Sequence, residues 1–446
     1  MPIERDLVQA DQAHVLHSLH HPSAHQTPKV WVEGRGAFVT DSTGKTYIDG
    51  LSGLWNVVVG HGREELAKVA YDQMCKLAYY TSYVGSTNEP ATHLASKLAE
   101  LFYPAINTFF FTSGGAESTE SGFKTARFYW KAVGQPEKVK FIARMKGYHG
   151  VTMAAMSATG LPAYWPMFEP RVPGFVHIES PYPYRFANPT PEVSDGVAAA
   201  NLLEAAILRE GPETVAAFIA EPVQGAGGVI VPQADYFARI RAICDQYDVL
   251  LIADEVITGF GRTGRWFGLE QYGIAPDIAL FAKAITSGYL PLGGIGVSDR
   301  IRDAIHSVPS DQRWMHASTY SGHPTACAVA LANLAIIERE GLVQRAAEMG
   351  AYLNQGLQTL TQMPQVGNVR GLGMMAAVEL VADQASKAPF PASANVGGRV
   401  LQELISRGLF TRVVGDTILL APPLITSTET LDRLVQIIGE ALVAVG

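Results

Sequence analysis

The sequence predicts an α/β protein in which a mostly parallel sheet lies between helices, with a smaller α+β domain beside it. Between about residues 62 and 320, short apolar runs alternate with stretches of helical periodicity, a pattern typical of parallel sheets covered by helices. The runs at 249–253 and 278–282 are apolar throughout, as expected for strands buried on both faces. Beyond residue 320, strands and helices are mixed, which predicts the second, smaller domain.

The elements are expected in three groups. Residues 1–60 contain a polar arm and short strands that belong to the small domain, residues 61–320 form the large domain, and residues 321–446 complete the small one. The strands of the first two groups are predicted at 29–32, 37–40, 45–50, 109–111, 139–143, 215–220, 249–253, 278–282 and 294–297. The last group is predicted as helix 325–340, helix 346–361, strands within 366–380, helix 394–407, strand 417–421 and helix 428–444.

Composition and charge narrow the class of protein. The 446 residues are 48% hydrophobic and 17% charged, with a net charge of −8 and no basic stripe, which argues against nucleic acid as a partner. No apolar run is long enough to span a membrane, and the first residues lack a signal-peptide pattern. Cys75, Cys244 and Cys327 have no metal or redox spacing. We therefore expect small buried thiols and a cytoplasmic enzyme.

The N-terminal arm is rich in histidine. His17 and His21 would share one face of a helix, which could indicate a metal site, but no cysteine or carboxylate cluster accompanies them. We expect a solvated or interface-covering arm and no metal. The arm holds five of the twelve histidines, namely His14, His17, His20, His21 and His25.

Two charged residues follow the central strands. Asp254 ends the run at 249–253 and Lys283 follows the run at 278–282. Ligands of open α/β sheets bind at the carboxyl ends of the strands. Pyridoxal phosphate (PLP) needs a lysine for its Schiff base and an acid that keeps its ring nitrogen protonated, so the pair predicts a PLP site in which Lys283 also moves the proton. Taken singly, a helix-capping Asp254 and a surface or ion-paired Lys283 remain alternatives.

Two further segments fit the same cofactor. Residues 113–116, Ser-Gly-Gly-Ala, join a strand to a helix, so the glycines would let a phosphate approach backbone N–H groups at the helix N-terminus. The alternative is an ordinary serine N-cap. Tyr148, in the Gly-Tyr-His-Gly segment 147–150, is suited to stack on a flat ring, although packing alone would also explain it.

The segment 259–264, Gly-Phe-Gly-Arg-Thr-Gly, matches the dinucleotide pattern GxGxxG. Five residues separate it from the strand that ends at 253, no convincing helix follows it, and no acid closes a second strand about 20 residues later. An NAD-dependent oxidoreductase is therefore kept only as a weak alternative. A non-catalytic dimer would leave Asp254 and Lys283 unexplained.

Over nearly its whole length the chain resembles the class III, or ω-, aminotransferases. The resemblance rests on residues 254–264, on Pro276-Asp277-Ile278 and on residues 283–294, whose order and spacing agree with the family signature. It implies a PLP-dependent transferase of fold type I, with a seven-stranded, mostly parallel sheet. It also implies an active site shared between two chains of a homodimer, with a tetramer possible.

The resemblance assigns the cofactor site residue by residue. Ser113, Gly114 and Gly115 would bind the phosphate, although Gly115 stands where the family usually has a second serine. Ser318 and Thr319 would reach the phosphate of the neighbouring subunit. The residues expected around the cofactor ring are Tyr148 on one face, Val256 on the other, Glu221 beside it, Gln224 at its phenolic oxygen, Asp254 at its nitrogen and Lys283 in the Schiff base.

The resemblance also suggests the substrate side. Arg412 resembles the mobile arginine that pairs with a substrate carboxylate, and a surface ion pair is its alternative. Leu54, Trp55 and Tyr83 would line the amine pocket. The expected reaction moves an amino group from an ω-amino acid, diamine or arylalkyl amine to pyruvate or another 2-oxo acid by a ping-pong route. An aminomutase or racemase on the same scaffold is the alternative.

Overall fold

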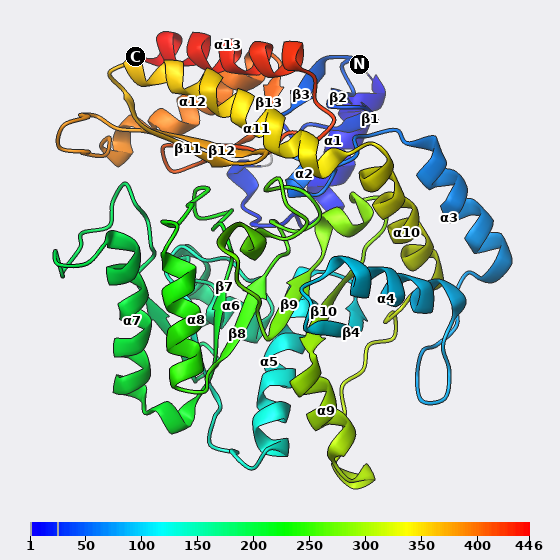
Figure 1. Cartoon of the computed structure of the whole chain (residues 1–446). Coiled ribbons are helices and arrows are strands. Elements are labelled where there is room, and N and C mark those ends of the chain that lie inside the picture. Colours follow the sequence, from blue (N-terminus) through cyan, green and yellow to red (C-terminus); the bar gives the residue numbers. More distant parts are fainter. Residues whose placement is uncertain (1, 25) are drawn as a thin grey trace.

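The computed structural model describes residues 2–24 and 26–446, which form two stacked layers (Figure 1). The lower layer is built around a large sheet and the upper layer carries two smaller sheets covered by the C-terminal helices. His25 of the arm lies outside the described residues. No helix among the described residues is both long and apolar enough to cross a membrane.

The large sheet has seven strands in the order β4-β10-β9-β8-β7-β5-β6. Only β10 runs antiparallel to its neighbours, so the mostly parallel seven-stranded sheet expected from the sequence is confirmed. Every residue of β7, β8 and β9 is buried, which explains their uniformly apolar sequences. The strands are β4 (Ile106–Thr112), β5 (Lys140–Arg144), β6 (Phe175–Ile178), β7 (Val215–Ala220), β8 (Leu250–Asp254), β9 (Ile278–Phe281) and β10 (Gly293–Ser298).

Helices cover this sheet. Helix α5 packs against β9 and β10, α7 packs against α8, and α10 packs against both α3 and α4. The helices of this layer are α3 (Glu64–Leu77), α4 (Glu89–Leu101), α5 (Gly115–Ala132), α6 (Met153–Ala158), α7 (Asp195–Glu210), α8 (Tyr236–Gln246), α9 (Asp299–Ser307) and α10 (Pro324–Arg339).

The upper layer joins the two ends of the chain. The N-terminal strands form a sheet of order β1-β2-β3-β13, in which Leu409 of β13 pairs with Ile48 of β3 in parallel register. A second sheet has the order β11-β12-β15-β14. The strands are β1 (Trp31–Arg35), β2 (Phe38–Asp41), β3 (Thr46–Asp49), β11 (Val366–Leu372), β12 (Met375–Leu380), β13 (Leu409–Phe410), β14 (Arg412–Val414) and β15 (Thr417–Leu420).

The remaining helices complete the chain. Helix α1 (Pro2–His14) lies in the arm, α2 (Ser52–Trp55) follows β3, and the upper layer carries α11 (Leu342–Gln358), α12 (Val396–Ser406) and α13 (Thr428–Val445). Short 3-10 helices are η1 (Pro22–Ala24), η2 (Pro162–Tyr164), η3 (Pro166–Phe168), η4 (Pro212–Thr214), η5 (Gly268–Tyr272), η6 (Lys283–Thr286), η7 (Ser310–Gln312), η8 (Thr359–Gln362) and η9 (Ala392–Ala394).

The cysteine prediction needs one correction. Cys244 and Cys327 are buried, as expected, and burial raises the pKa of each thiol to about 12. Cys75 is exposed on α3, so the expectation of a buried hydrophobe is wrong there. The cause is that α3 has Leu66 as its only buried residue and turns the rest of its surface outward.

Candidate active site

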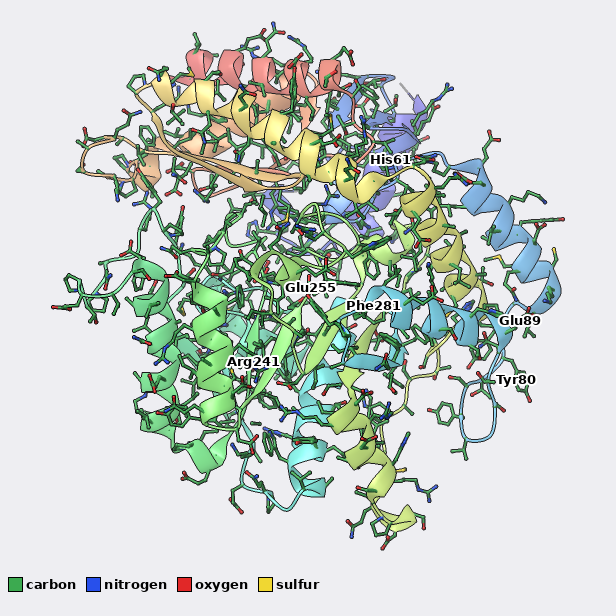
Figure 2. All side chains as sticks on the ribbon, in the orientation of Figure 1. His61, Tyr80, Glu89, Arg241, Glu255 and Phe281 are labelled. Carbon is green, nitrogen blue, oxygen red and sulfur yellow. The ribbon has the colours of Figure 1, made fainter. Side chains whose placement is uncertain are left out.

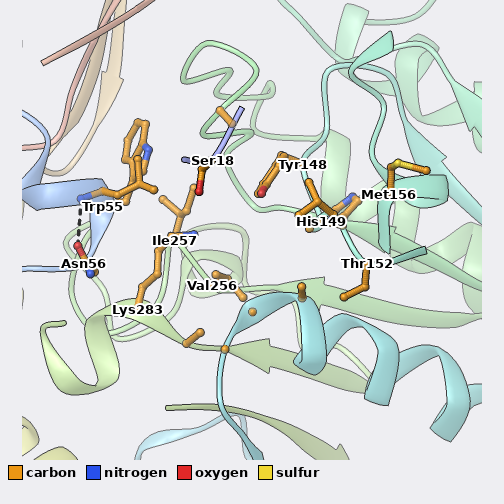
Figure 3. A pocket seen from close by; sticks show the side chains of 18 of the residues that line it. Ser18, Trp55, Asn56, Tyr148, His149, Thr152, Met156, Val256, Ile257 and Lys283 are labelled. Carbon is orange, nitrogen blue, oxygen red and sulfur yellow. Dashed lines mark hydrogen bonds between the residues drawn. The ribbon is translucent and has the colours of Figure 1, made fainter. Parts of the chain in front are cut away.

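A cavity of about 1240 Å³ lies where the two layers meet. Its floor comes from the segments that follow β4, β5, β7, β8 and β9, which is where open α/β sheets bind ligands. The upper layer contributes residues 54–56 and Arg412, and the arm contributes residues 17–20. Figure 3 shows Lys283 and Val256 in the lower part of the cavity and Ser18 above them.

Asp254, the last residue of β8, is held by two donors. Its Oδ2 lies 2.7 Å from Nδ1 of His149, and its Oδ1 accepts the backbone N–H of Val256 at 3.1 Å. Both side chains of the His149–Asp254 pair are buried. Asp254 does not cap a helix, because a turn follows it rather than a helix. Its carboxyl group therefore lines the cavity in an orientation that these two hydrogen bonds fix.

Lys283 lies at the start of η6 and lines the same cavity as Asp254. Its backbone φ is +51°, in the left-handed region that non-glycine residues occupy rarely and mainly at functional sites. Burial lowers the pKa of its amine, and the negative charges of Asp254 and Glu221 oppose that effect in part. The amine is thus biased toward its neutral, nucleophilic form.

The turn from β4 into α5 forms an open cradle. Helix α5 begins at Gly115 with Gly114 as its N-cap, and no side chain caps it, so the serine N-cap alternative is wrong. Instead, the backbone N–H of Ser113 donates to Oε2 of Glu117 at 2.8 Å. A Cβ placed on Gly115 would lie 3.0 Å from Cγ1 of Val256. The small residues keep this helix end open to an anion.

Tyr148 and Glu221 are coupled through the backbone. Tyr148 lines the cavity with its ring 5.8 Å from that of Tyr164. Its backbone N–H donates to Oε1 of Glu221 at 3.0 Å, and the N–H of Gly225 donates to Oε2 at 2.9 Å. Burial raises the pKa of Glu221, while His149 opposes this change.

Gln224 is buried close by, but its amide is engaged elsewhere. Its Oε1 accepts from Ser180 Oγ at 2.6 Å, and its Nε2 donates to the carbonyl of Met145 at 2.9 Å. It does not line the cavity among the described residues. A contact between Gln224 and the phenolic oxygen of the cofactor stays a prediction.

Three of the sequence-predicted substrate residues meet at the cavity. Leu54, Trp55 and Arg412 all line it. Arg412 begins β14, and no carboxylate of the described residues forms an ion pair with it. The surface ion pair considered for Arg412 is therefore not formed, and its guanidinium is available to a ligand.

The other predicted contacts, Tyr83, Ser318 and Thr319, lie outside this chain's cavity. Their two segments are tied together, because Tyr79 donates its hydroxyl to the carbonyl of Thr319 at 2.7 Å and Ser82 donates to that of Ser321 at 2.7 Å. These hydrogen bonds hold the two segments together, and the expectation that Ser318 and Thr319 serve the neighbouring subunit's phosphate stays a prediction.

Sequence reasoning missed two groups of lining residues. His149 follows Tyr148 in the segment 147–150, yet its contact with Asp254 joins loops more than 100 residues apart. Residues 17–20 of the arm also line the cavity. Only the density of histidines marked the arm, and it led to the expectation of a solvated or interface-covering arm rather than of a part of the site. Within the described part of the chain, no three His, Cys, Asp or Glu side chains gather at a metal-binding distance.

The GxGxxG segment has a structural role. Arg262 within it is fully buried and donates to the carbonyls of Pro422 at 2.6 Å and Met374 at 3.2 Å and to Ser52 Oγ at 3.0 Å. These partners belong to the upper layer, so the segment fastens the two layers together. It does not form a strand-to-helix nucleotide loop.

The cavity suits PLP by its donor set. A lysine amine, a buried carboxylate held open by two donors, an uncapped N-terminus of an 18-residue helix and an aromatic ring all face one space. These groups match the aldehyde, ring nitrogen, phosphate and flat ring of PLP.

Comparisons with known proteins agree with this fit. The model of the family "Aminotransferase class-III" matches residues 20–442. A thermostable (S)-enantioselective ω-transaminase from Thermomicrobium roseum is 50% identical and superposes with a TM-score of 0.96 over 99% of this chain and 98% of its own. A putrescine–pyruvate aminotransferase of Pseudomonas aeruginosa is 41% identical over 93% of this chain and 90% of its own.

A diaminobutyrate–2-oxoglutarate transaminase of Halomonas elongata is 42% identical over 98% of this chain and 95% of its own. The family resemblance seen in the sequence is thereby confirmed. The chain belongs to the class-III aminotransferases, a family of PLP-dependent enzymes.

Proposed function

We propose that this enzyme moves an amino group from a primary amine or ω-amino acid to pyruvate or a similar 2-oxo acid, by a ping-pong route. The observation that carries the proposal is that Lys283, Asp254 and Arg412 face one cavity from three separate elements. PLP, when bound, supplies the electrophilic carbon and the electron sink. The protein supplies binding, orientation and proton transfer.

The roles of the protein groups follow from their surroundings. The Lys283 amine would hold the cofactor and, once displaced, take the proton from the substrate carbon, because its neutral form is favoured. Asp254 would pair with the ring nitrogen, since its carboxylate is buried and held by two donors. Tyr148 and Val256 would contact the two faces of the ring, and residues 113–115 would receive the phosphate.

The substrate pocket supports an apolar amine and a monocarboxylate acceptor. Leu54, Trp55, Met156 and Phe168 give its wall an apolar character. Arg412 is the only arginine among the described lining residues, and a guanidinium can take one carboxylate in bidentate fashion. One such group suits pyruvate better than a dicarboxylate. The names of the relatives, which include a putrescine–pyruvate aminotransferase, agree with an ω-amine donor.

A homodimer with shared active sites is part of the proposal. Tyr83 and the pair Ser318 and Thr319 lie outside the cavity of their own chain, as expected if they complete the site of a partner. Because exposed Cys75 carries a free thiol, a reducing compartment such as the cytoplasm suits the chain.

The visible spectrum of the purified holoenzyme tests this function. Amine donors are added singly without an acceptor, and pyruvate is added afterwards. We expect each good donor to bleach the yellow form and pyruvate to restore it. Lys283→Ala should lose the covalent lysine–cofactor band and turnover, while Lys131→Ala on the exposed end of α5 serves as a matched control.

The outcomes are distinct. Full turnover by Lys283→Ala would show that the proposed base is wrong. Conversion of an amino acid without any net amino transfer to pyruvate would instead identify an aminomutase or racemase. Absorbance changes that depend on added NAD would favour the oxidoreductase alternative over a transaminase.

A further inference from the structure

His149 is buried next to the acid of the active site. Its Nδ1 lies 2.7 Å from Oδ2 of Asp254, and its backbone N–H donates to Thr159 Oγ1 at 2.9 Å. Its side chain is 1% exposed, and Nε2 is buried without a hydrogen-bond partner among the described residues. A histidine needed only for packing would not place its nitrogen on a buried carboxylate, where an apolar ring would fill the same space.

A second acid, Glu221, lies near the other ring nitrogen, Nε2. A Cβ placed on Gly147 would lie 3.2 Å from Nε2 of His149 and 3.6 Å from Oε1 of Glu221. Glycine at 147 thus leaves the space between the imidazole and Glu221 open. The imidazole thus lies close to two buried carboxyl groups, that of Asp254 at the end of β8 and that of Glu221 directly after β7.

Other ionisable groups around this pair matter for its charge. Lys283 lies across the cavity, Arg144 lies at the end of β5, and His177 lies on β6. Arg144 donates to the backbone carbonyl of Glu221, and His177 contacts the carbonyl of Ala158 at 3.1 Å. None of these three basic groups forms an ion pair with Asp254 within the described part of the chain, so His149 is its direct side-chain partner.

We propose that His149 is a positioning residue that donates its Nδ1–H to Asp254 and thereby keeps this carboxylate aimed at the cofactor ring nitrogen. The proposal rests on the role given above to Asp254. With one oxygen held by His149 and the other by the N–H of Val256, the carboxylate plane is fixed. Its remaining lone pairs are left for the ring.

The consequence is chemical as well as structural. A carboxylate that loses a donor in a buried site becomes a stronger base. Asp254 would then draw the proton away from the ring nitrogen, and the cofactor would become a weaker electron sink. The proton on the ring nitrogen also lowers the pH at which the visible band titrates, so losing it should move that midpoint upward.

The test uses the holoenzyme with His149→Leu, His149→Asn and Asp254→Asn. The amide nitrogen of asparagine takes nearly the place of Nδ1, so His149→Asn keeps a donor, whereas His149→Leu removes it. We expect His149→Leu to shift the midpoint of the visible-band pH titration upward and to lower kcat roughly 10- to 100-fold, as for the loss of one hydrogen bond to a charged group. His149→Asn should keep most of the wild-type midpoint and most of the wild-type kcat, and its KM for the amine should change little.

Each outcome decides the proposal. If His149→Leu folds and binds cofactor with an unchanged midpoint and kcat, or if His149→Asn is as impaired as His149→Leu, the donor role is wrong. If Asp254→Asn itself leaves the midpoint unchanged, the role of Asp254 has failed rather than that of His149. Should His149→Leu not fold, His149→Gln replaces it, because that amide reaches the Nε2 position. Equal behaviour of His149→Gln and His149→Asn would then contradict the proposal.

Discussion

Burial gives Lys283 its chemistry. A lysine in water is protonated at neutral pH and cannot act as a nucleophile or base. Removal from water lowers the pKa of the Lys283 amine, and the two nearby carboxylates of Asp254 and Glu221 limit that change. Both carboxylates are already hydrogen-bonded to other groups. Glu221 accepts hydrogen bonds from two backbone N–H groups, and Asp254 accepts one from Nδ1 of His149. The amine is therefore activated without being locked into an ion pair.

Arg412 is expected to recognise the acceptor rather than the amine. Arg412→Ala removes the bidentate partner of a carboxylate, so kcat/KM for pyruvate should fall roughly 10- to 100-fold. The half-reaction with an uncharged arylalkyl amine should stay within about twofold. Single-turnover spectra of the two half-reactions measure both values. Arg412→Lys is the control that keeps the charge, and an equal loss in both half-reactions would contradict the assigned role.

The sequence predicted that Asp254 and Lys283 meet at one cavity, where their roles stay predictions, but it gave no sign of some of the residues around them. The strand-end rule brought Asp254 and Lys283 to one cavity, because parallel strands share one carboxyl edge. The left-handed backbone of Lys283 and the contact of His149 with Asp254 depend on how distant loops pack. Local pattern carries no signal for such contacts. The contact expected between Gln224 and the cofactor stays a prediction, because the amide of Gln224 is hydrogen-bonded to Ser180 and Met145, two contacts that local pattern does not reveal.

At the scale of elements, patterns of five or more apolar residues located the central strands. The edge strand β6 (Phe175–Ile178) was missed because it has four residues and includes the polar His177. Strands β13 and β14 have two and three residues, too few for any period to show. Arg412 is the first residue of β14 and follows β13 by two positions, so these short elements decide how the substrate side of the site is built.

The arm is an element whose role follows only from its position. Residues 17–20 lie over the cavity, and Gln12 donates to the carbonyl of Gln26 at 2.8 Å to hold the arm back on itself. Its exposed apolar side chains include Leu16, at 87% exposure, and Leu19, at 63%. The arm therefore narrows the entrance while adding little to the folded core.

Removal of residues 1–20 should widen the entrance and change selectivity more than stability. We expect kcat/KM for a small amine to fall on the order of 10-fold, the effect of losing a few apolar contacts to substrate, while bulky arylalkyl amines are less affected. The melting temperature should hardly change. A full-length variant with His17→Ala and His20→Ala is the control. It shows whether an effect of the truncation comes from the two imidazoles or from the backbone of the arm. Unchanged kcat/KM for every amine would show that the arm takes no part in binding.

At the scale of the whole molecule, several large apolar side chains are exposed. Tyr71 is 68% exposed, Val84 92% and Met315 78%, and Tyr80 projects from the loop between α3 and α4 (Figure 2). Exposed apolar surface of this kind marks interaction sites. The segments that hold it also carry Tyr83, Ser318 and Thr319. A second copy of the chain that covers this surface would thus receive them at its own cavity.

Shared sites can be tested by mixing two inactive variants. Lys283→Ala lacks the amine, and Thr319→Asp would set a carboxylate against the cofactor phosphate; Thr319 is exposed, so the fold should tolerate the change. In a mixed dimer, one of the two sites would combine an intact Lys283 with an intact Thr319 of the other chain. After co-refolding of equal amounts we expect about a quarter of wild-type activity, since half of the dimers are mixed and each has one intact site.

The result decides between a Thr319 that serves the partner's site and a Thr319 that serves its own chain's site, because activity returns only in the first case. If each chain used its own Thr319, every site in the mixture would carry one of the two changes and activity would stay at the level of the separate variants. Co-refolding Lys283→Ala with Asp254→Asn is the matched control, because both residues line the cavity of one chain. In that mixture every site carries one of the two changes, so its activity should stay at the level of the separate variants and gives the background. Recovery in the Lys283→Ala and Thr319→Asp mixture alone requires that each active site be completed by the partner, whereas recovery in neither mixture would place Thr319 at its own chain's site.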